Sequence, residues 1–571
     1  MTQEANNASL AFLRKENIVA PPGYNRWRVP PASIAIHLCI GSVYAWSVFN
    51  TPLTRELGVM ASAADDWSLS SVVWIFSVAI VILGLAAAFA GKWLEDVGPR
   101  YVGVVAAILW GGGFVVGSIG IAQHQLWLVY LGYGVFGGAG LGLGYVSPVS
   151  TLIRWFPDRR GMATGMAIMG FGGGAMIGAP LIQWLLSTFA VAPTYLGTEA
   201  AVTLVTENGI RFAETASGKL EVVVATAQQA ANFAGNSSGA GVYVVGTGNT
   251  GASATFLTLG IVYFIVMTIA AFQYRVPAKD WKPAGWTPQP SKSGMVTKHN
   301  VHIDQALRTP QFWLLWIVLC FNVTAGIGVI GVAKTMINEI FGELAIVTAT
   351  FAGTYVLMIS VFNMIGRFFW ASTSDFIGRK ATYFCFFVLG PVLYLSIPYF
   401  AISGGMTALI GFYIATMIIF TMYGGGFATI PAYLADIFGT MHVGGIHGRL
   451  LTAWSTAGVL GPFAVTYLRD LSRNNAIEQV AAVVDPEAFA TKFGAPLGEL
   501  MNLVETKTVT LGKLMEIAPA GTVDPTPSLY NTTMYAMAGL LVIAFFANLL
   551  VRPVKEHHHV ENTHPKMAPA E

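Results

Sequence analysis

Long apolar segments separated by polar ones recur along the chain from about residue 31 to residue 551. Each segment is about 20 residues long, which is enough for an α-helix to cross the hydrocarbon core of a bilayer. The pattern predicts an all-α polytopic membrane protein with twelve transmembrane helices. We expect the first six spans at residues 31–52, 69–92, 101–121, 126–151, 162–189 and 254–274. We expect the second six at residues 311–333, 346–371, 382–402, 405–431, 449–468 and 530–551.

Two long polar segments, residues 190–253 and 469–529, interrupt this rhythm. In the first, residues 203–212 alternate apolar and polar side chains around an Asn-Gly pair, and a second β-like run follows at 241–245; together they predict a small hairpin. In the second, Asp485-Pro486-Glu487 is a helix start signal, and a further amphipathic run follows at 497–504. We expect the two inserts to form a structured cap.

The distribution of Lys and Arg among the short loops predicts the orientation in the membrane. One side carries most of them: Arg14, Lys15, Arg26, Arg28, Arg100, Arg154, Arg159, Arg160, Arg275, Lys279, Lys282, Lys292, Lys298, Arg308, Arg379 and Lys380. The loops of the opposite side offer little beyond Arg55 and Lys334. Both termini are therefore predicted to be cytoplasmic and both inserts external, in a plasma membrane (the inner membrane if the source is bacterial). The first 28 residues are polar and predict no cleavable signal peptide.

These boundaries divide the chain into segments. We expect a cytoplasmic segment at 1–30, a six-helix bundle at 31–275, a cytoplasmic linker at 276–310, a second six-helix bundle at 311–551 and a cytoplasmic tail at 552–571. The inserts 190–253 and 469–529 belong to the first and the second bundle, respectively.

The composition agrees with a membrane protein, since 54% of the residues are hydrophobic and 11% charged, against about a quarter charged in soluble proteins. The net charge of +2 is spread over loops and gives no reason to expect nucleic acid as a partner. Cys39, Cys320 and Cys385 all fall in apolar spans, which indicates neither a disulfide framework nor a metal site. We find no catalytic constellation, and expect no enzyme activity, no cofactor and a monomeric chain.

Short patterns in the first half of the chain recur in the second half, at a nearly constant separation in the sequence. Asp96 and Asp375 stand in similar Asp-x-Gly-x-Arg turns after spans two and eight, and Pro148 and Pro431 end similar stretches of spans four and ten. This indicates two six-span halves in the same orientation. Parallel repeats of this kind place a substrate site near the membrane midplane, between the halves.

The two Asp-x-Gly-x-Arg turns are candidate gates. An acidic and a basic residue on a tight glycine turn can cap a helix end and clamp a neighbouring span. The candidate gating residues are Asp96 and Arg100 in the first turn, and Asp375 and Arg379 in the second. An ordinary charged turn is the alternative for one copy, but two copies in matching positions favour a transport gate.

Arg367 is a lone cation inside span eight. An ionisable residue in a membrane segment is costly to bury and is a functional-site hypothesis by default. The alternative is that its guanidinium extends along the helix end into water. Position alone does not decide between the two.

Aromatic and polar residues in other spans could surround such an arginine. The candidates for substrate binding are Tyr44 and His37 in span one, Tyr145 in span four, Tyr423 in span ten and Trp454 in span eleven. Tyr and Trp supply rigid apolar walls with one hydrogen-bond donor each, so they would suit a small anion with an apolar body. Packing against lipid is the alternative for each aromatic residue, and His37 reads more as a packed residue than as a proton carrier.

Several of these stretches resemble a known family. The gate turns and the six-plus-six plan are similar to the major facilitator superfamily. Gly41-Ser-Val-Tyr-Ala-Trp-Ser-Val-Phe49, the segment from Tyr145 to Gly161 and Met169-Gly-Phe-Gly-Gly-Gly174 resemble its oxalate/formate antiporter family. The resemblance implies that Arg367 binds a substrate carboxylate, as an arginine of the related monocarboxylate transporters does. It also implies that Tyr44 and Tyr145 line the pocket.

One departure bears on the substrate. The family's oxalate carrier has a second cation, a lysine after Thr-Ala in span eleven, where this chain has Thr452-Ala453-Trp454. One cation beside a tryptophan implies a monocarboxylate, moved by a secondary active transporter with a proton or a counter-anion. Asn363 and Val48 stand where the monocarboxylate transporters have an acid and a lysine, so their proton coupling does not carry over. An oxalate/formate-type dicarboxylate exchanger and a membrane sensor that uses the external inserts stay open as alternatives.

Overall fold

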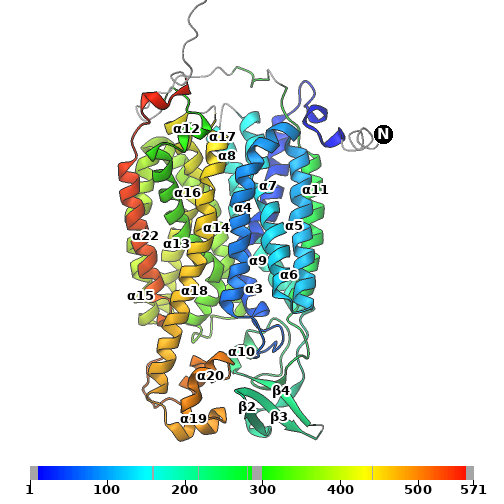
Figure 1. Ribbon diagram of the computed structural model, residues 1–571, viewed down its shortest axis with the longest axis vertical. Helices are drawn as coiled ribbons and strands as arrows, with labels where there is room; N and C mark the ends of the chain where they lie inside the picture. Colours follow the sequence, from blue (N-terminus) through cyan, green and yellow to red (C-terminus); the bar gives the residue numbers. More distant parts are fainter. Residues whose placement is uncertain are drawn as a thin grey trace, which may run out of the picture.

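The computed structural model describes residues 11–156, 160–216, 218–278, 281–285, 297, 299–439 and 442–560. Its long helices run along one axis, with those from the first half of the chain on one side and those from the second half on the other (Figure 1). This confirms the expected all-α polytopic class with two helical bundles.

The first bundle is built from helices that are bent or broken in several places. Its elements are α2 (Val29–Gly41), η4 (Ser42–Ala45), α3 (Ser47–Leu53), α4 (Leu69–Val97), α5 (Pro99–Ala122), α6 (Leu126–Val129), the π-helical η5 (Tyr130–Gly137), α7 (Gly138–Trp155), α8 (Arg160–Gly172), α9 (Gly174–Phe189) and α11 (Ala252–Phe272). The first span bends by 49° between its two parts. Such breaks are tolerated in membrane helices where neighbouring helices cover the exposed backbone.

The second bundle contains longer helices. Its elements are α13 (Pro310–Phe341), α14 (Ala349–Ile377), α15 (Arg379–Ser403), α16 (Gly405–Phe438), α17 (Val443–Leu450), α18 (Thr452–Ala481) and α22 (Asn531–Leu550). α13 continues well past the predicted span end at residue 333, so the expectation that Lys334 belongs to a loop was wrong. A single lysine in an otherwise apolar stretch ended the sequence pattern but not the helix.

Ten helices of the described chain are long and apolar enough to cross a membrane, and the bent first span would be an eleventh. α18 is absent from this set although it lies among the spanning helices (Figure 1). Its second half carries Arg469, Asp470 and Arg473, which lower its hydropathy. The count of twelve spans stays a prediction.

The internal repeat is visible at the helix ends. α4 begins where the Ser68 hydroxyl accepts a hydrogen bond from the Ser71 amide, and α14 begins in the same way at Thr348. Both helices end at a glycine with positive φ, +91° at Gly98 and +88° at Gly378, from which the next helix starts at once. A residue with a β-carbon is strained in this conformation, so the turn requires glycine.

The first insert folds into an antiparallel sheet of five strands, larger than the expected hairpin. Its strands are β1 (Tyr195–Gly197), β2 (Leu204–Glu207), β3 (Ile210–Thr215), β4 (Gly218–Ala225) and β5 (Gly241–Val244), in the order β1-β5-β4-β3-β2. The predicted hairpin is the β2–β3 pair, and its turn residues Asn208 and Gly209 both have positive φ. The run at 241–245 pairs instead with β4 and β1.

The second insert is helical, as predicted. It contains α19 (Pro486–Phe493), where Asp485 caps the Ala488 amide, followed by η7 (Leu497–Glu499), α20 (Leu500–Glu505) and α21 (Leu511–Met515). It lies beside the first insert at the end of the bundles opposite the N-terminus (Figure 1). Lys492 bonds Glu199 at 2.9 Å, and Thr206 donates to the Phe493 carbonyl at 2.9 Å. The inserts of the two halves are therefore bonded to each other.

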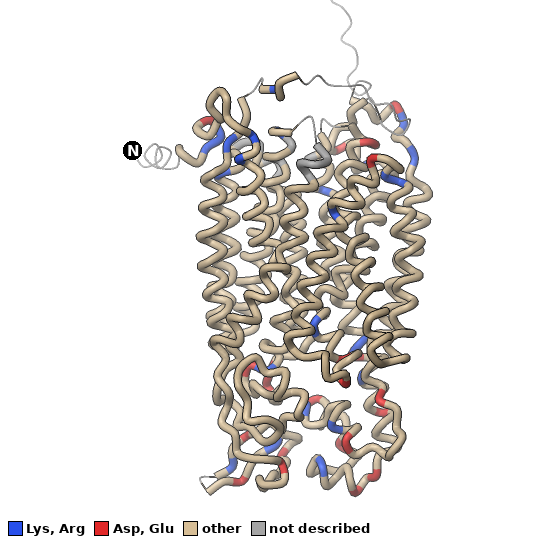
Figure 2. The backbone as a smooth tube through the Cα atoms, turned by 180° about the vertical axis from the view of Figure 1, so that it is seen from behind, with Lys and Arg blue, Asp and Glu red and all other residues tan. Residues whose placement is uncertain are grey.

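Charged residues gather at the two ends of the molecule and are scarce in between (Figure 2). At the insert end, a cavity of about 1140 Å³ lies between the bundles and the inserts. We call it the insert-side cavity. Asn50, Gln183, Lys334 and Asn338 line it from the bundles, and Lys507 lines it from the second insert.

Candidate functional site

Arg367 lies on α14 at the interface between the bundles and is 0% exposed. Its Nε donates a hydrogen bond to Asn363 Oδ1, one turn earlier, at 3.0 Å. Within the described residues, neither terminal guanidinium nitrogen, Nη1 or Nη2, has a hydrogen-bond partner. The interpretation that its guanidinium reaches water at the helix end is wrong for this conformation.

The neighbours of Arg367 leave its guanidinium little freedom. A β-carbon added at Gly172, on the opposite bundle, would lie only 2.6 Å from Arg367 Nε. The guanidinium carbon stands 5.9 Å from the ring centre of Phe171 and 5.2 Å from that of Phe427. A guanidinium between aromatic faces is held by cation–π attraction, but these contacts use none of its N–H donors.

Tyr44 and Tyr423 meet across the interface between the bundles. Their hydroxyl oxygens are 2.9 Å apart, and their rings are 5.9 Å apart in an edge-on arrangement. Tyr44 lies in η4 of the first span and Tyr423 in α16, and both are buried. The two residues predicted from separate spans therefore form one contact.

Tyr145 and Trp454 form a second cross-bundle pair, with ring centres 5.5 Å apart. Both rings also pack edge-on against Phe171, each at 5.5 Å. In the described structure the Tyr145 hydroxyl and the Trp454 Nε1 are buried without a hydrogen-bond partner. Two further donors are thus unused near the aromatic residues that flank Arg367.

His37 is close to this cluster, but its polar atoms are occupied. Nδ1 contacts the Ala167 carbonyl oxygen, and Nε2 lies 3.2 Å from the Tyr145 carbonyl oxygen. The ring joins α2 to α7 and α8 and packs 5.4 Å from the Tyr145 ring. The arrangement favours the packed role, and a role for His37 in substrate binding would require one of these contacts to break.

Phe171 and Phe427 were not singled out from the sequence. Phe171 touches Tyr44, Tyr145 and Trp454, and Phe427 packs 4.6 Å from Trp454. An aromatic residue in an apolar span carries no local signal that distinguishes a pocket wall from lipid packing. Phe171 lies within the quoted motif at 169–174, and Phe427 lies in the stretch of span ten that ends at Pro431; these positions were the available signal.

The cluster is closed on the insert side by contacts between the bundles. Asn50 Nδ2 donates to the Gly331 carbonyl at 2.9 Å, which joins α3 to α13. The Ser360 hydroxyl donates to the Gly172 carbonyl at 2.7 Å and accepts from the Met176 amide at 3.0 Å. These bonds separate the cluster from the insert-side cavity.

The bundles also meet on the side of the termini. The Ser455 hydroxyl donates to the Val81 carbonyl at 2.9 Å, which joins α18 to α4. A β-carbon at Gly448 would stand 3.4 Å from the Ala87 carbonyl oxygen, so α17 lies close to α4 as well. With contacts on both sides and Arg367 fully buried, this conformation is occluded.

The second gate turn forms a compact ion cluster. Arg379 lies 2.5 Å from Asp375 and 3.5 Å from Asp436, so it joins the end of α14 to α16. In the first turn, Arg100 donates to the carbonyls of Phe12 and Phe272, both at 2.9 Å. The side chain of Asp96 lies outside the described residues. Both arginines make clamping contacts, and their part in gating stays a prediction.

Throughout the described ranges, His, Cys, Asp and Glu form no group of three that could hold a metal ion. What the cluster offers is an uncompensated cation, unused hydrogen-bond donors and aromatic walls. Such a set can bind a small anion, with its charge at Arg367 and its apolar part against the rings.

Comparison with known proteins agrees with the fold. Residues 32–206 match the sequence model described as Major Facilitator Superfamily. A bacterial homologue of the human lysosomal transporter Spinster, solved in an inward-facing and occupied conformation, superposes with a TM-score of 0.56. The comparison covers 93% of this chain and 97% of that one at 13% identity, so it supports the fold alone.

Two curated proteins are similar over most of the chain. The oxalate:formate antiporter of Oxalobacter formigenes is 26% identical over 446 residues, 76% of this chain and 83% of that protein. Apicoplast pyruvate carrier 1 of Toxoplasma gondii is 23% identical over 468 residues, 73% of this chain and 78% of that protein. The resemblance inferred from the sequence motifs is confirmed.

Proposed function

We propose that this chain is a transporter of the major facilitator superfamily, which the match of residues 32–206 and the similarity to the oxalate:formate antiporter support. Within that superfamily it would be a secondary active transporter of a small organic anion, most simply a monocarboxylate. The two bundles would alternate access to a site between them. Arg367 would hold the carboxylate, Tyr44, Tyr145 and Tyr423 would donate hydrogen bonds, and Trp454 would wall the apolar end.

The observation that carries the proposal is the unpaired guanidinium of Arg367. Burying a cation without a counter-charge costs several kcal/mol, so such a residue is retained where a partner arrives during function. A carboxylate can accept two parallel hydrogen bonds from the guanidinium fork. It would satisfy Nη1 and Nη2, both unpartnered in the described structure, at the same time.

The number of cations supports one carboxylate rather than two. Among the residues that surround the site in the described structure, Arg367 is the cation, and Trp454 stands within the aromatic cluster. A second carboxylate would meet aromatic rings and, among the described residues, no second positive charge, at a high desolvation cost. The relatives' names, an oxalate:formate antiporter and a pyruvate carrier, point to carboxylates as the substrate class.

The test is uptake of labelled monocarboxylates by cells or proteoliposomes that contain Arg367→Lys. Lysine keeps the charge but lacks the fork, so we expect uptake to fall by at least about ten-fold with normal membrane insertion. Arg449→Lys is the matched control, because Arg449 pairs with Asp304 at the exposed end of the second bundle. Uptake at the wild-type level in Arg367→Lys would contradict the proposal.

A thermal-shift screen identifies the substrate without an assumption about whether transport is coupled to a proton or to a counter-anion. A ligand that binds only the folded protein raises its melting temperature. Formate, acetate, pyruvate and lactate should stabilise the wild type more than oxalate or malonate. The shift should disappear in Arg367→Lys and remain in Arg449→Lys.

A further inference from the structure

A second cation stands between the inserts and the central site. Lys334 lies on α13, is half-buried and lines the insert-side cavity. Gly331, one turn earlier on the same helix, accepts the Asn50 hydrogen bond that joins the bundles. Lys334 is therefore placed on the floor of this cavity, next to the contact that closes the central site.

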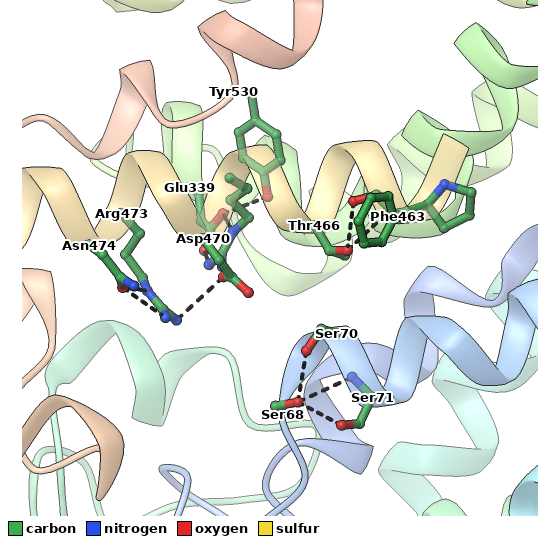
Figure 3. Close-up of polar contacts among 12 residues, drawn as sticks. Ser68, Ser70, Ser71, Glu339, Phe463, Thr466, Asp470, Arg473, Asn474 and Tyr530 are labelled. Carbon is green, nitrogen blue, oxygen red and sulfur yellow. Dashed lines mark hydrogen bonds and ion pairs between the residues drawn. The ribbon is translucent and has the colours of Figure 1, made fainter. Parts of the chain in front are cut away.

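A network of paired charges lies beside the same helix. Glu339 accepts hydrogen bonds from Arg469 Nε at 2.8 Å and from the Tyr530 hydroxyl at 2.6 Å, and Figure 3 shows this group on α18 and its neighbours. Asp470 lies 2.9 Å from Arg469 and 3.6 Å from Arg473. The carboxylates of this network are therefore already paired with arginines.

The other cations of the cavity also have acceptors. Arg55 donates to the Met60 carbonyl at 3.0 Å, and Lys507 donates to the Ala63 carbonyl at 3.1 Å. Lys513 reaches the Thr508 carbonyl at 3.4 Å. For Lys334, by contrast, the described residues supply no hydrogen bond and no ion pair, although Glu343 lines the cavity beyond the end of α13.

Polar groups around Lys334 could complete an anion site. Asn338 follows one turn later on the same helix, lines the cavity and has a buried side-chain oxygen without a partner in the described structure. An amide can turn to present its NH₂ group to an anion. Gln183 lines the cavity from the opposite bundle and bonds the Ala349 carbonyl at 3.0 Å. The floor thus combines one free ammonium with neutral polar groups from both bundles.

We propose that Lys334 forms an outer binding site for the carboxylate, occupied before the anion passes to Arg367. This inference rests on the proposed function and adds a second site in series. A lysine ammonium is a strongly hydrated point charge on a flexible stem, so it would hold an anion more loosely than the arginine fork. A positive charge within a walled cavity concentrates anions and speeds their capture.

The test compares transport from the two sides of the membrane. In Lys334→Gln we expect the KM for uptake from the insert side to rise about ten-fold, since the charge that concentrates the anion is lost. The maximal rate should stay within about two-fold, because Arg367 and the gates are untouched. Uptake from the opposite side, measured in inverted vesicles, should keep its KM.

Lys334→Arg should restore the wild-type KM, and Lys513→Gln is the matched control. Lys513 lines the same cavity from α21, so its loss changes the net charge equally at another place. An equal rise of KM in Lys513→Gln would overturn the proposal, because the overall positive charge of the cavity, and not a site at Lys334, would then explain the effect. An unchanged KM in Lys334→Gln would overturn it as well.

Asn338→Asp provides a second variant should Lys334→Gln fold poorly. It places a carboxylate one turn from Lys334, where an ion pair can form, and should raise the same KM while the lysine remains. A wild-type KM in Asn338→Asp would overturn the proposal. Wild-type protein without Arg367-dependent carboxylate uptake would instead contradict the proposed function, so the two failures are distinguishable.

Discussion

The hydroxyl oxygens of Tyr44 and Tyr423 lie 2.9 Å apart and join the first span of one bundle to α16 of the other. Both residues are buried, so the bond forms away from bulk water. If the bundles move apart at Tyr44 and Tyr423 during transport, the bond must break. The same hydroxyls then become available to a ligand at Arg367, which links closure of the site to its occupation.

We therefore expect Tyr44→Phe and Tyr423→Phe to have similar and non-additive effects. Each removes one hydrogen bond, worth about 1 kcal/mol, so the KM for the carboxylate should rise by roughly five-fold. The effect of the double variant should be smaller than the sum of the two single effects, since the two hydroxyls also share one bond with each other. Uptake kinetics of the wild type, the two single variants and the double variant in proteoliposomes measure this double-mutant cycle. Tyr399→Phe, at an exposed tyrosine on α15, is the control. Fully additive effects would show that the hydroxyls act independently.

The class, the repeat and the central arginine could be predicted because they leave local signals. A lone charge in an apolar run marks Arg367, and Gly98 and Gly378 mark the repeated turns. Two walls of the site, Phe171 and Phe427, could not be predicted, since they are defined by contacts between spans. Lys334 was assigned to a loop because hydropathy alone cannot distinguish a helix that lines a cavity from a helix end.

The inserts illustrate a second limit. The β2–β3 hairpin is local, with an Asn-Gly turn between alternating strands, and was foreseen. The remaining strands pair over longer distances, as when β1 at Tyr195 meets β5 at Tyr243. Such pairing depends on how the chain returns after α10 (Ala227–Ala231), and no short-range pattern encodes it.

Gly172→Ala should disable the site without a change of charge. The new β-carbon would stand 2.6 Å from Arg367 Nε, so the guanidinium has to shift. A displacement of about 1 Å at a positioned group can cost up to a hundred-fold in rate, and we expect uptake to fall at least ten-fold. Gly165→Ala on the same helix is the matched control, because its β-carbon would meet nothing within 4 Å. Equal uptake in the two variants would contradict the assigned place of Arg367.

Trp454→Lys should shift the preference towards dicarboxylates. Trp454 packs on Phe171 and Phe427, the two rings that flank Arg367, so a lysine there would add a second cation to the site. We expect the ratio of oxalate to formate uptake to rise by about ten-fold, as one charge-assisted hydrogen bond is gained. Trp454→Gln removes the ring without adding charge and serves as the control. The same substrate profile in both variants would count against the predicted pocket.

Glu56 should make the stability of the protein depend on pH. It lies in the segment that follows α3, and the Thr250 hydroxyl donates to its carboxylate. Burial raises the pKa of Glu56 from 4.5 to about 7. Between these two values the unfolded chain gives up its proton first, so stability falls as the pH rises through this window. Above pH 7 the full penalty applies, ~3 kcal/mol for a shift of this size.

Glu56→Gln keeps an oxygen for Thr250 but cannot ionise. We expect the variant to match the wild type near pH 4.5 and to melt at a higher temperature at pH 8, where the wild type carries the buried charge. Melting curves of purified protein over this range provide the measurement. Glu487→Gln, an exposed position on α19, controls for the loss of one negative charge. A stability difference that stays constant with pH would show that Glu56 acts through packing and not through its ionisation.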